Sequence, residues 1–302
     1  MNLKKIVKIN IIYSFSIILL FSLTGCSREE PSLNEKATNE VEYLGSKFVS
    51  ILNRLNNITF ENYQITTEQA KLSKDSAEQE KSSSSVASQS GEQGGVGEEG
   101  DNSGGKSGQT EEDTTIIASQ MSPNTILNPT TTEIDWAGLK NEVENIYYAW
   151  NTILLDLYQL ETSNDDILGF SADLDKATTY IKNEDKANSL LAVANLYGYL
   201  PRYLETVSDD EAKKNVTRTI SFILNSYALV ETGDWDSVRS EIDKAEETFR
   251  LVTNDVNFVS SNSYRVNKTY VLLNELKNSL SLEDKDIFYI KYRNLLEEIN
   301  QL

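Results

Sequence analysis

The sequence contains no histidine and only one cysteine among its 302 residues. Histidine is the commonest general base at neutral pH and the usual ligand of zinc, so its absence excludes Ser-His and Cys-His nucleophile pairs and histidine-ligated metal sites. A single cysteine also excludes a disulfide within the chain. Phosphate-binding loops and the glycine motif of dinucleotide-binding folds are missing as well. We therefore expect no cofactor and no metal site, and a non-enzymatic role is favoured.

Basic residues are scarce. The sequence has 28 Lys and Arg against 47 Asp and Glu, which gives a net charge of −19. Binding to phosphate backbones requires Lys or Arg to release counterions, so we expect no nucleic-acid partner. The same excess of acid opposes adsorption to anionic lipid headgroups and favours solubility.

Long apolar runs are confined to the N-terminus. Lys4, Lys5 and Lys8 precede an apolar stretch that runs from Ile11 to Leu23. This stretch is shorter than the about 20 apolar residues that a membrane-spanning helix needs. Basic residues followed by a short apolar core are typical of a signal peptide, which we expect to cover residues 1–25.

The apolar stretch ends in Leu23-Thr24-Gly25-Cys26, which resembles the lipobox of bacterial lipoproteins. The resemblance implies that Cys26 receives a lipid on its sulfur, becomes the first residue after cleavage and anchors the protein to the extracytoplasmic face of the cell membrane. Removal of the three lysines takes the net charge from −19 to −22. The alternative is an unmodified thiol after an ordinary secretory signal.

Aromatic residues are absent between Tyr63 and Trp136, and eight of the 14 glycines fall between Gly91 and Gly108. A segment so poor in apolar groups cannot form a core, and glycine with scattered acids keeps the backbone flexible. The sequence therefore predicts a disordered linker over residues 61–133.

An amphipathic helix is predicted before this linker, over residues 35–60, behind a short spacer of residues 26–34. Its apolar residues recur at three- and four-residue steps: Val41, Leu44, Phe48, Ile51, Leu52, Leu55 and Ile58. Alone in water the helix would expose this stripe, so we expect it to dock on the C-terminal domain; pairing with another chain is the alternative.

Residues 134–302 have helical periodicity throughout and predict about seven helices. Alternating strand patterns and hairpin signals are missing, so we expect an all-α domain. Short loops make neighbouring helices antiparallel, which leaves an antiparallel helical bundle and a short stack of helical hairpins as alternatives. Pro201 should kink or end the third helix. The predicted starts of the other helices are Asn164, Ser208 in a capping box with Glu211, Asp234, Ser263, and Ser281 with Asp284.

One stretch resembles a single tetratricopeptide unit. Tyr227 is followed by Gly233-Asp234-Trp235 at the turn, and Ala245 and Phe249 lie on the second helix. Stable arrays need three or more repeats, and no second copy is found. A helix that ends at glycine and a following helix capped by aspartate explain the same residues, and we favour that interpretation.

Clusters of acids are the residues to inspect for a paired-carboxylate hydrolase or a cation site. Most of them stand at predicted helix starts, where the amide dipoles favour negative charge, so capping is the favoured interpretation. The clusters are Asp165-Asp166, Asp173 with Asp175, Asp209-Asp210-Glu211, and Asp234 with Asp236.

Aromatic residues offer a second lead, because Tyr197, Tyr199, Arg202 and Tyr203 lie close together in the sequence. Consecutive helical residues point about 100° apart, so these rings cannot all face one core. They are candidate ligand contacts that could stack on sugars or hold a peptide; a core role is the alternative.

We interpret the chain as a membrane-anchored extracytoplasmic lipoprotein with a non-enzymatic helical binding or scaffolding domain. Its partners are the membrane, through the lipid, and a cell-wall component, peptide or partner protein. Two alternatives stay open: a carboxylate-dependent cell-wall hydrolase or metal-binding receptor, and a tetratricopeptide-like peptide-binding module.

Overall fold

The structure is a computed structural model that describes residues 31–58, 126, 127, 129 and 133–302. The lipobox with Cys26 and nearly all of the predicted linker lie outside these residues. The regular elements of the described residues are helices, and no strand occurs among them. The predicted all-α class is confirmed.

The described ranges contain nine α-helices and one short 3₁₀ helix. In chain order they are α2 (Leu33–Leu55), α4 (Trp136–Gln159), α5 (Asn164–Lys182), α6 (Lys186–Tyr197), α7 (Leu200–Val207), α8 (Glu211–Val230), α9 (Trp235–Asn254), α10 (Val256–Ser279), η1 (Leu280–Leu282) and α11 (Lys285–Ile299).

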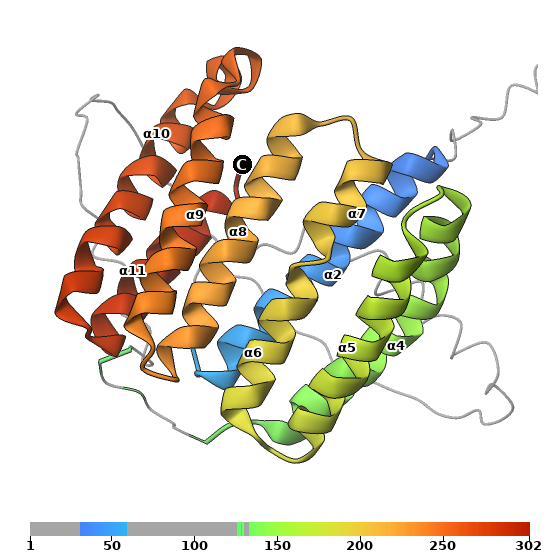
Figure 1. Ribbon diagram of the computed structural model, residues 1–302, viewed down its shortest axis with the longest axis horizontal. Coiled ribbons are helices and arrows are strands. Elements are labelled where there is room, and N and C mark those ends of the chain that lie inside the picture. The colour runs from blue at the N-terminus through green and yellow to red at the C-terminus, as the bar shows by residue number, and fades with distance from the viewer. Residues whose placement is uncertain (1–30, 59–125, 128, 130–132) are drawn as a thin grey trace, which may run out of the picture.

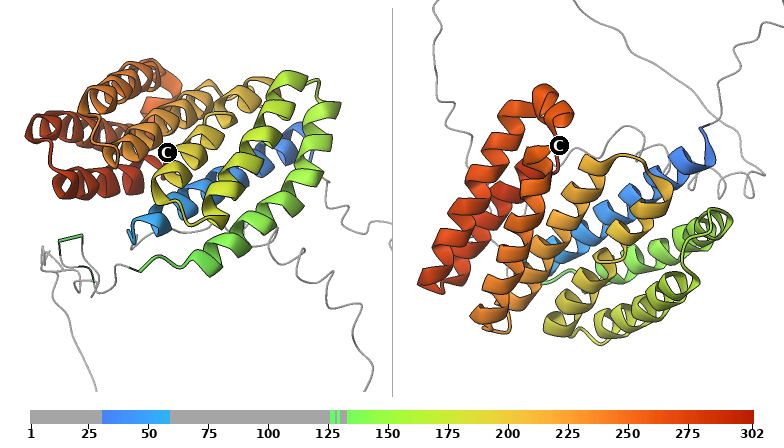
Figure 2. Two further views of the ribbon diagram at one scale, coloured as in Figure 1. Left: turned by 60° about the horizontal axis from the view of Figure 1, so that its bottom comes forward. Right: turned by 45° about the horizontal axis from the view of Figure 1, so that its top comes forward.

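The helices form two groups that share one hydrophobic core. In the first group α2, α4, α5 and α6 pack in a ring, because α4 contacts α5, α5 contacts α6, and α2 contacts both α4 and α6. In the second group α8, α9, α10 and α11 pack in succession and α11 returns to contact α8. α8 also packs on α6 and α7 and so joins the groups, which lie side by side (Figures 1 and 2). The arrangement is a helical bundle.

α2 is an integral part of the bundle, although residues 59–125 separate it from the other helices in the sequence. It lies against α4, α6 and α7 (Figure 1). All seven residues of its predicted apolar stripe are buried. Burial of one such side chain contributes roughly 1.5–3 kcal/mol relative to exposure, so the stripe strongly favours the packed position. The prediction that this helix docks on the C-terminal domain is confirmed.

Two predicted helix starts are wrong by one or two residues. α5 is capped by Ser163, whose hydroxyl accepts a hydrogen bond from the Asp166 amide, and not by Asn164. α8 is capped by Asp210, which accepts from the Lys213 amide at 2.9 Å. Ser208 cannot form the predicted capping box because it still ends α7, with its amide bound to the Leu204 carbonyl.

The described part of the C-terminal region contains eight α-helices where about seven were predicted, because the third predicted helix is divided in two. α6 ends at Tyr197, and α7 begins at Leu200 with Pro201 in its first turn. Proline lacks an amide hydrogen and is tolerated in a first turn, so its effect here is to begin a helix after the break. α10 also begins earlier than the predicted Ser263, at Val256, with a kink at Asn262.

Gly233 and Asp234 form the turn between α8 and α9. Gly233 has a φ of +74°, which glycine adopts without the steric cost of a Cβ atom. Asp234 then caps α9 by accepting from the Ser237 amide at 3.1 Å. The glycine end and the aspartate cap favoured from the sequence are confirmed.

A candidate ligand-binding groove

A groove of about 740 Å³ lies where the two groups of helices face each other. α2 forms one side, and α11 with the first half of α10 forms the other. The N-terminal half of α8 and part of α7 form the floor. The groove therefore depends on α2 and α11, which come from opposite ends of the sequence and both lie beside α8.

The α2 side of the groove follows from its helical spacing. Val41, Gly45 and Val49 stand four residues apart and line the groove along one face of the helix. At Gly45 a Cβ atom would lie 3.2 Å from Leu200 Cδ1 and 3.3 Å from a ring carbon of Tyr197. Glycine at this position therefore allows α2 to approach the floor closely.

The floor of the groove is largely apolar. α8 contributes Val216, Thr217 and Ile220, and α7 contributes Leu200 and Leu204. A lining that is apolar below and charged at the edges is typical of sites that bind peptides or small amphipathic molecules.

The rims of the groove carry charges of both signs. On the α2 side, Lys213 of α8 forms an ion pair with Glu42 at 2.6 Å, and both side chains are more than one third exposed. On the other side, Arg265 donates a hydrogen bond to the side chain of Gln301, and Glu297 of α11 lies nearby on the lining. Exposed ion pairs add little stability, so these groups can exchange their partners for those of a ligand at small cost.

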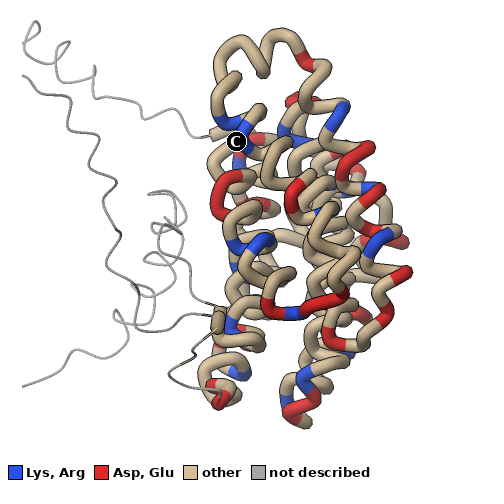
Figure 3. The backbone as a smooth tube through the Cα atoms, turned by 90° about the vertical axis from the view of Figure 1, so that its left-hand side faces the viewer, with Lys and Arg blue, Asp and Glu red and all other residues tan. Residues whose placement is uncertain are grey.

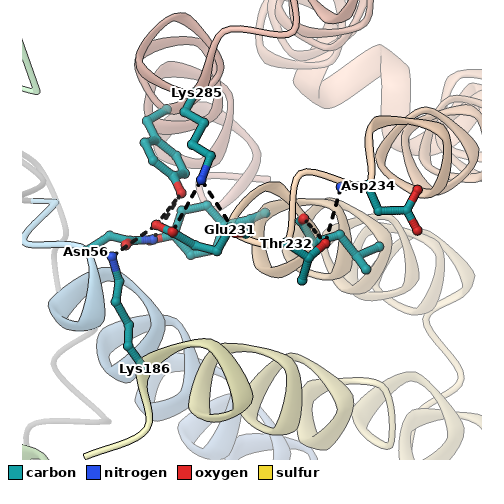
Figure 4. A network of polar contacts seen from close by, with 9 residues as sticks. Asn56, Lys186, Glu231, Thr232, Asp234 and Lys285 are labelled. Atoms are coloured by element: carbon teal, nitrogen blue, oxygen red, sulfur yellow. Dashed lines mark hydrogen bonds and ion pairs between the residues drawn. The ribbon is translucent and has the colours of Figure 1, made fainter.

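A polar cluster away from the groove lining surrounds Glu231 and includes Asn56, Lys186, Lys285 and Tyr289 (Figure 4). The Glu231 carboxylate lies 3.0 Å from Lys186 Nζ and accepts from the Tyr289 hydroxyl at 2.9 Å. Burial raises the pKa of Glu231, but Lys186, Tyr289 and Lys285 outweigh this effect and hold the pKa below its usual range. Glu231 therefore stays ionised and joins α6, α8 and α11.

Three hydrogen bonds fix the C-terminal end of α2 beside this Glu231 cluster. Tyr292 donates from its hydroxyl to Asn53 Oδ1 at 3.1 Å, and Tyr227 donates to the Leu52 carbonyl at 3.1 Å. Asn56 Nδ2 donates to the Tyr227 hydroxyl at 2.7 Å. The Tyr227 and Tyr292 rings stack with centroids 4.3 Å apart. α2 and α11 are thus held together near the C-terminal end of α2, and the groove lies further toward the N-terminus of α2, at Val41 to Val49.

The four predicted ligand contacts do not form one site. Tyr197 is 5 % exposed and lines the groove. Tyr199 and Tyr203 are buried on the far side of α7, where their hydroxyls donate to Asp173 Oδ2 and to the Asp166 carbonyl. Their rings therefore pack in the core and offer no face for a sugar or peptide to stack on.

Arg202 is the exposed member of the predicted set. Its guanidinium lies 4.2 Å from the centre of the Tyr199 ring and 2.5 Å from Asp166 Oδ1. The cation is thus held by a stacked ring and a carboxylate, outside the groove.

The acid clusters are occupied by caps and ion pairs. Asp210 and Asp234 cap α8 and α9. Asp173 accepts from Lys176, Asn195 and Tyr199, and these hydrogen bonds outweigh burial and lower its pKa. Within the described ranges no group of three acids, histidines or cysteines could hold a metal ion.

Acidic and basic residues are interspersed along the helices and do not gather into a basic face in the view of Figure 3. Among the described residues no helix is both long and apolar enough to cross a membrane.

Comparison with known proteins gives no identification. No protein-family model matches the chain, and no curated protein or solved structure shows significant similarity to it.

Proposed function

We propose that the chain is an extracytoplasmic lipoprotein, anchored through Cys26, whose helical domain binds a peptide segment of a partner in the groove between α2 and α11. The single observation that carries the binding role is the groove itself: about 740 Å³ with an apolar floor and rims of both signs. The anchoring rests on the lipobox resemblance and the apolar stretch that precedes Cys26.

The composition of the lining favours a peptide over other ligands. Apolar side chains of a peptide would cover Val216 and Ile220, and its charged groups would meet Glu42 and Arg265 on the two rims. An acyl chain would leave the charges on the rims without partners on the ligand.

Photo-crosslinking in cells tests the binding role. A photoreactive amino acid placed at Thr217, on the groove floor, should yield one dominant adduct whose mass spectrum identifies a peptide. The matched control is Thr179, an exposed threonine on α5 away from the groove. Equal adducts at the two positions, or an adduct with lipid or glycan at Thr217, would refute the proposal.

The anchoring is tested by labelling with a palmitate analogue. The wild-type chain should carry the label and sediment with membranes, and Cys26→Ser should lose both. An equal label on the serine variant would contradict lipid attachment at this residue.

A further inference from the structure

The interface between α2 and α4 holds one more carboxylate than its cations match. Lys36, Lys47 and Arg54 of α2 form ion pairs with acids of α4 and of its N-cap. Those acids are Asp135, Glu142 and Asp156, so three cations face three acids. Glu40 of α2 is the additional acid, and it lies on the same side of the helix, one turn after Lys36.

Glu40 is buried and incompletely satisfied. Its residue is 6 % exposed, and Asp156 is 7 % exposed. Lys36 Nζ lies 2.6 Å from Asp156 Oδ2 but 3.6 Å from Glu40 Oε1. Glu40 Oε2 is buried without a hydrogen-bond partner. One lysine thus serves two buried acids, and it is bound closely to only one of them.

Among the described residues, the other helices in contact with α2 place their charges elsewhere, and Lys213 of α8 pairs with Glu42, not with Glu40. From α7 the local contact is neutral: the Thr38 hydroxyl donates to the Val207 carbonyl. The charged residues of α7, Arg202 and Glu205, form ion pairs elsewhere with Asp166 and Arg218. Lys186, the charged residue of α6, binds Glu231 in the cluster at the other end of α2. The charges that act on Glu40 are those of Lys36 and Asp156.

We infer that the buried Glu40 carboxyl holds a proton in the folded protein, beside the Asp156 carboxylate, and that loss of this proton to water loosens the N-terminal half of α2. The proton supplies the donor that Glu40 Oε2 lacks and removes the excess charge from the interface. Where the proposed function holds, the device also regulates it, because Val41, Glu42 and Gly45 of the same segment form a wall of the groove.

The sign of the pH dependence follows from the pKa of Glu40. Burial raises this pKa, Lys36 lowers it and Asp156 raises it, and the result is about 7, compared with 4.5 for a free glutamate. A folded-state pKa that lies above the unfolded one gives stability that is complete below about pH 4.5 and is lost as the pH rises to about 7. The packed position of α2 should therefore be most stable in weak acid.

Hydrogen exchange of the full chain, purified in detergent, tests the proposal. After correction for intrinsic rates, the protection of α2 amides should fall on the order of 50-fold between pH 5 and pH 8 if opening exposes Glu40 to water. Glu40→Gln keeps the shape of the side chain without its charge, so α2 should stay protected at pH 8 and most of the pH dependence should disappear.

Two further variants make the result decisive. Asp156→Asn leaves Glu40 alone with Lys36, so the loss of protection should move to lower pH. Glu144→Gln removes an exposed acid of α4 and should keep the wild-type profile. The inference is overturned if Glu40→Gln retains the wild-type pH dependence or if all three variants lose it equally. Because exchange is measured without a ligand, failure of the groove to bind a peptide would leave this result unaffected.

Discussion

At the scale of single residues, the ends of the helices depend on backbone conformations that only some side chains tolerate. Gly233, Asn57, Glu161, Glu184 and Glu283 all have positive φ just after a helix ends. A Cβ atom in this conformation costs roughly 1 kcal/mol relative to glycine. Of the five, only Gly233 avoids that cost.

A matched pair of substitutions tests this point. Gly233→Ala should lower the free energy of unfolding by about 1 kcal/mol, since a Cβ atom there has space but an unfavourable φ of +74°. Glu161→Gly should raise it by a similar amount, since Glu161 is exposed with a φ of +59°. Urea denaturation measures both, and the same sign of change in the two variants would contradict the explanation.

The start of α8 gives a second test at this scale. Asp210→Ala removes the carboxylate that accepts from the Lys213 amide and should cost about 1 kcal/mol. Ser208→Ala removes a hydroxyl that accepts only from the Asp210 amide and should cost less. Thermal unfolding of the two variants measures both losses of stability. A larger loss of stability for Ser208→Ala would support the capping box predicted from the sequence and contradict Asp210 as the cap.

These residues also show why helices can be predicted from the sequence more reliably than the residues at which they begin and end. Apolar spacing extends over many residues, so one unusual position does not hide a helix. A cap is one residue, and Ser208, Asp209 and Asp210 are all good caps in sequence. The choice among them depends on where α7 ends, which is set by packing of Leu204 and Val207 in the core.

At the scale of elements, α2 is held by both its apolar stripe and its polar ends. The stripe was visible in the sequence, and so was the need to cover it. The helices that cover it, α4, α6 and α7, could not be identified from the sequence, because they lie far from α2 along the chain. The buried Glu40 was equally hidden, since an isolated glutamate in an amphipathic helix is expected to face solvent.

The contact between α2 and α11 can be measured by a double-mutant cycle. Tyr292→Phe leaves Asn53 buried without one of its partners and should cost about 1–2 kcal/mol. Asn53→Ala should cost at least as much, because Tyr292 then keeps a buried hydroxyl without this acceptor. If the effects of the two substitutions were additive in chemical denaturation, the hydrogen bond would contribute nothing and α2 would be held by other contacts.

At the scale of the whole molecule, the all-α class followed from the sequence because periodicity and short loops are local signals. The groove did not follow, since it requires α2 and α11 to lie together across 239 residues, as the bond from Tyr292 to Asn53 shows. The burial of two of the predicted tyrosines was not visible in the sequence for a related reason. From the sequence, Tyr199 and Tyr203 were not expected to be buried together with Tyr197. In the structure, Phe170 of α5 packs against the rings of Tyr199 and Tyr203 and helps to bury them.

The packing of α2 has a consequence for anchoring. The lipid is predicted on Cys26, a few residues before α2, and the remaining helices follow the predicted linker. Two connections would therefore join the helical domain to the membrane: the covalent linker and the noncovalent packing of α2. The second connection should hold without the first, because all seven apolar residues of the stripe are buried.

Cutting the linker in cells tests this account most directly. A protease site is inserted near residue 100, the cells are opened at pH 6, and the fragment that begins after the cut is followed. We predict that it stays in the membrane fraction through α2 and leaves with the soluble fraction in Cys26→Ser. Complete release of the fragment from wild-type membranes would show that α2 does not hold the domain and would contradict the account.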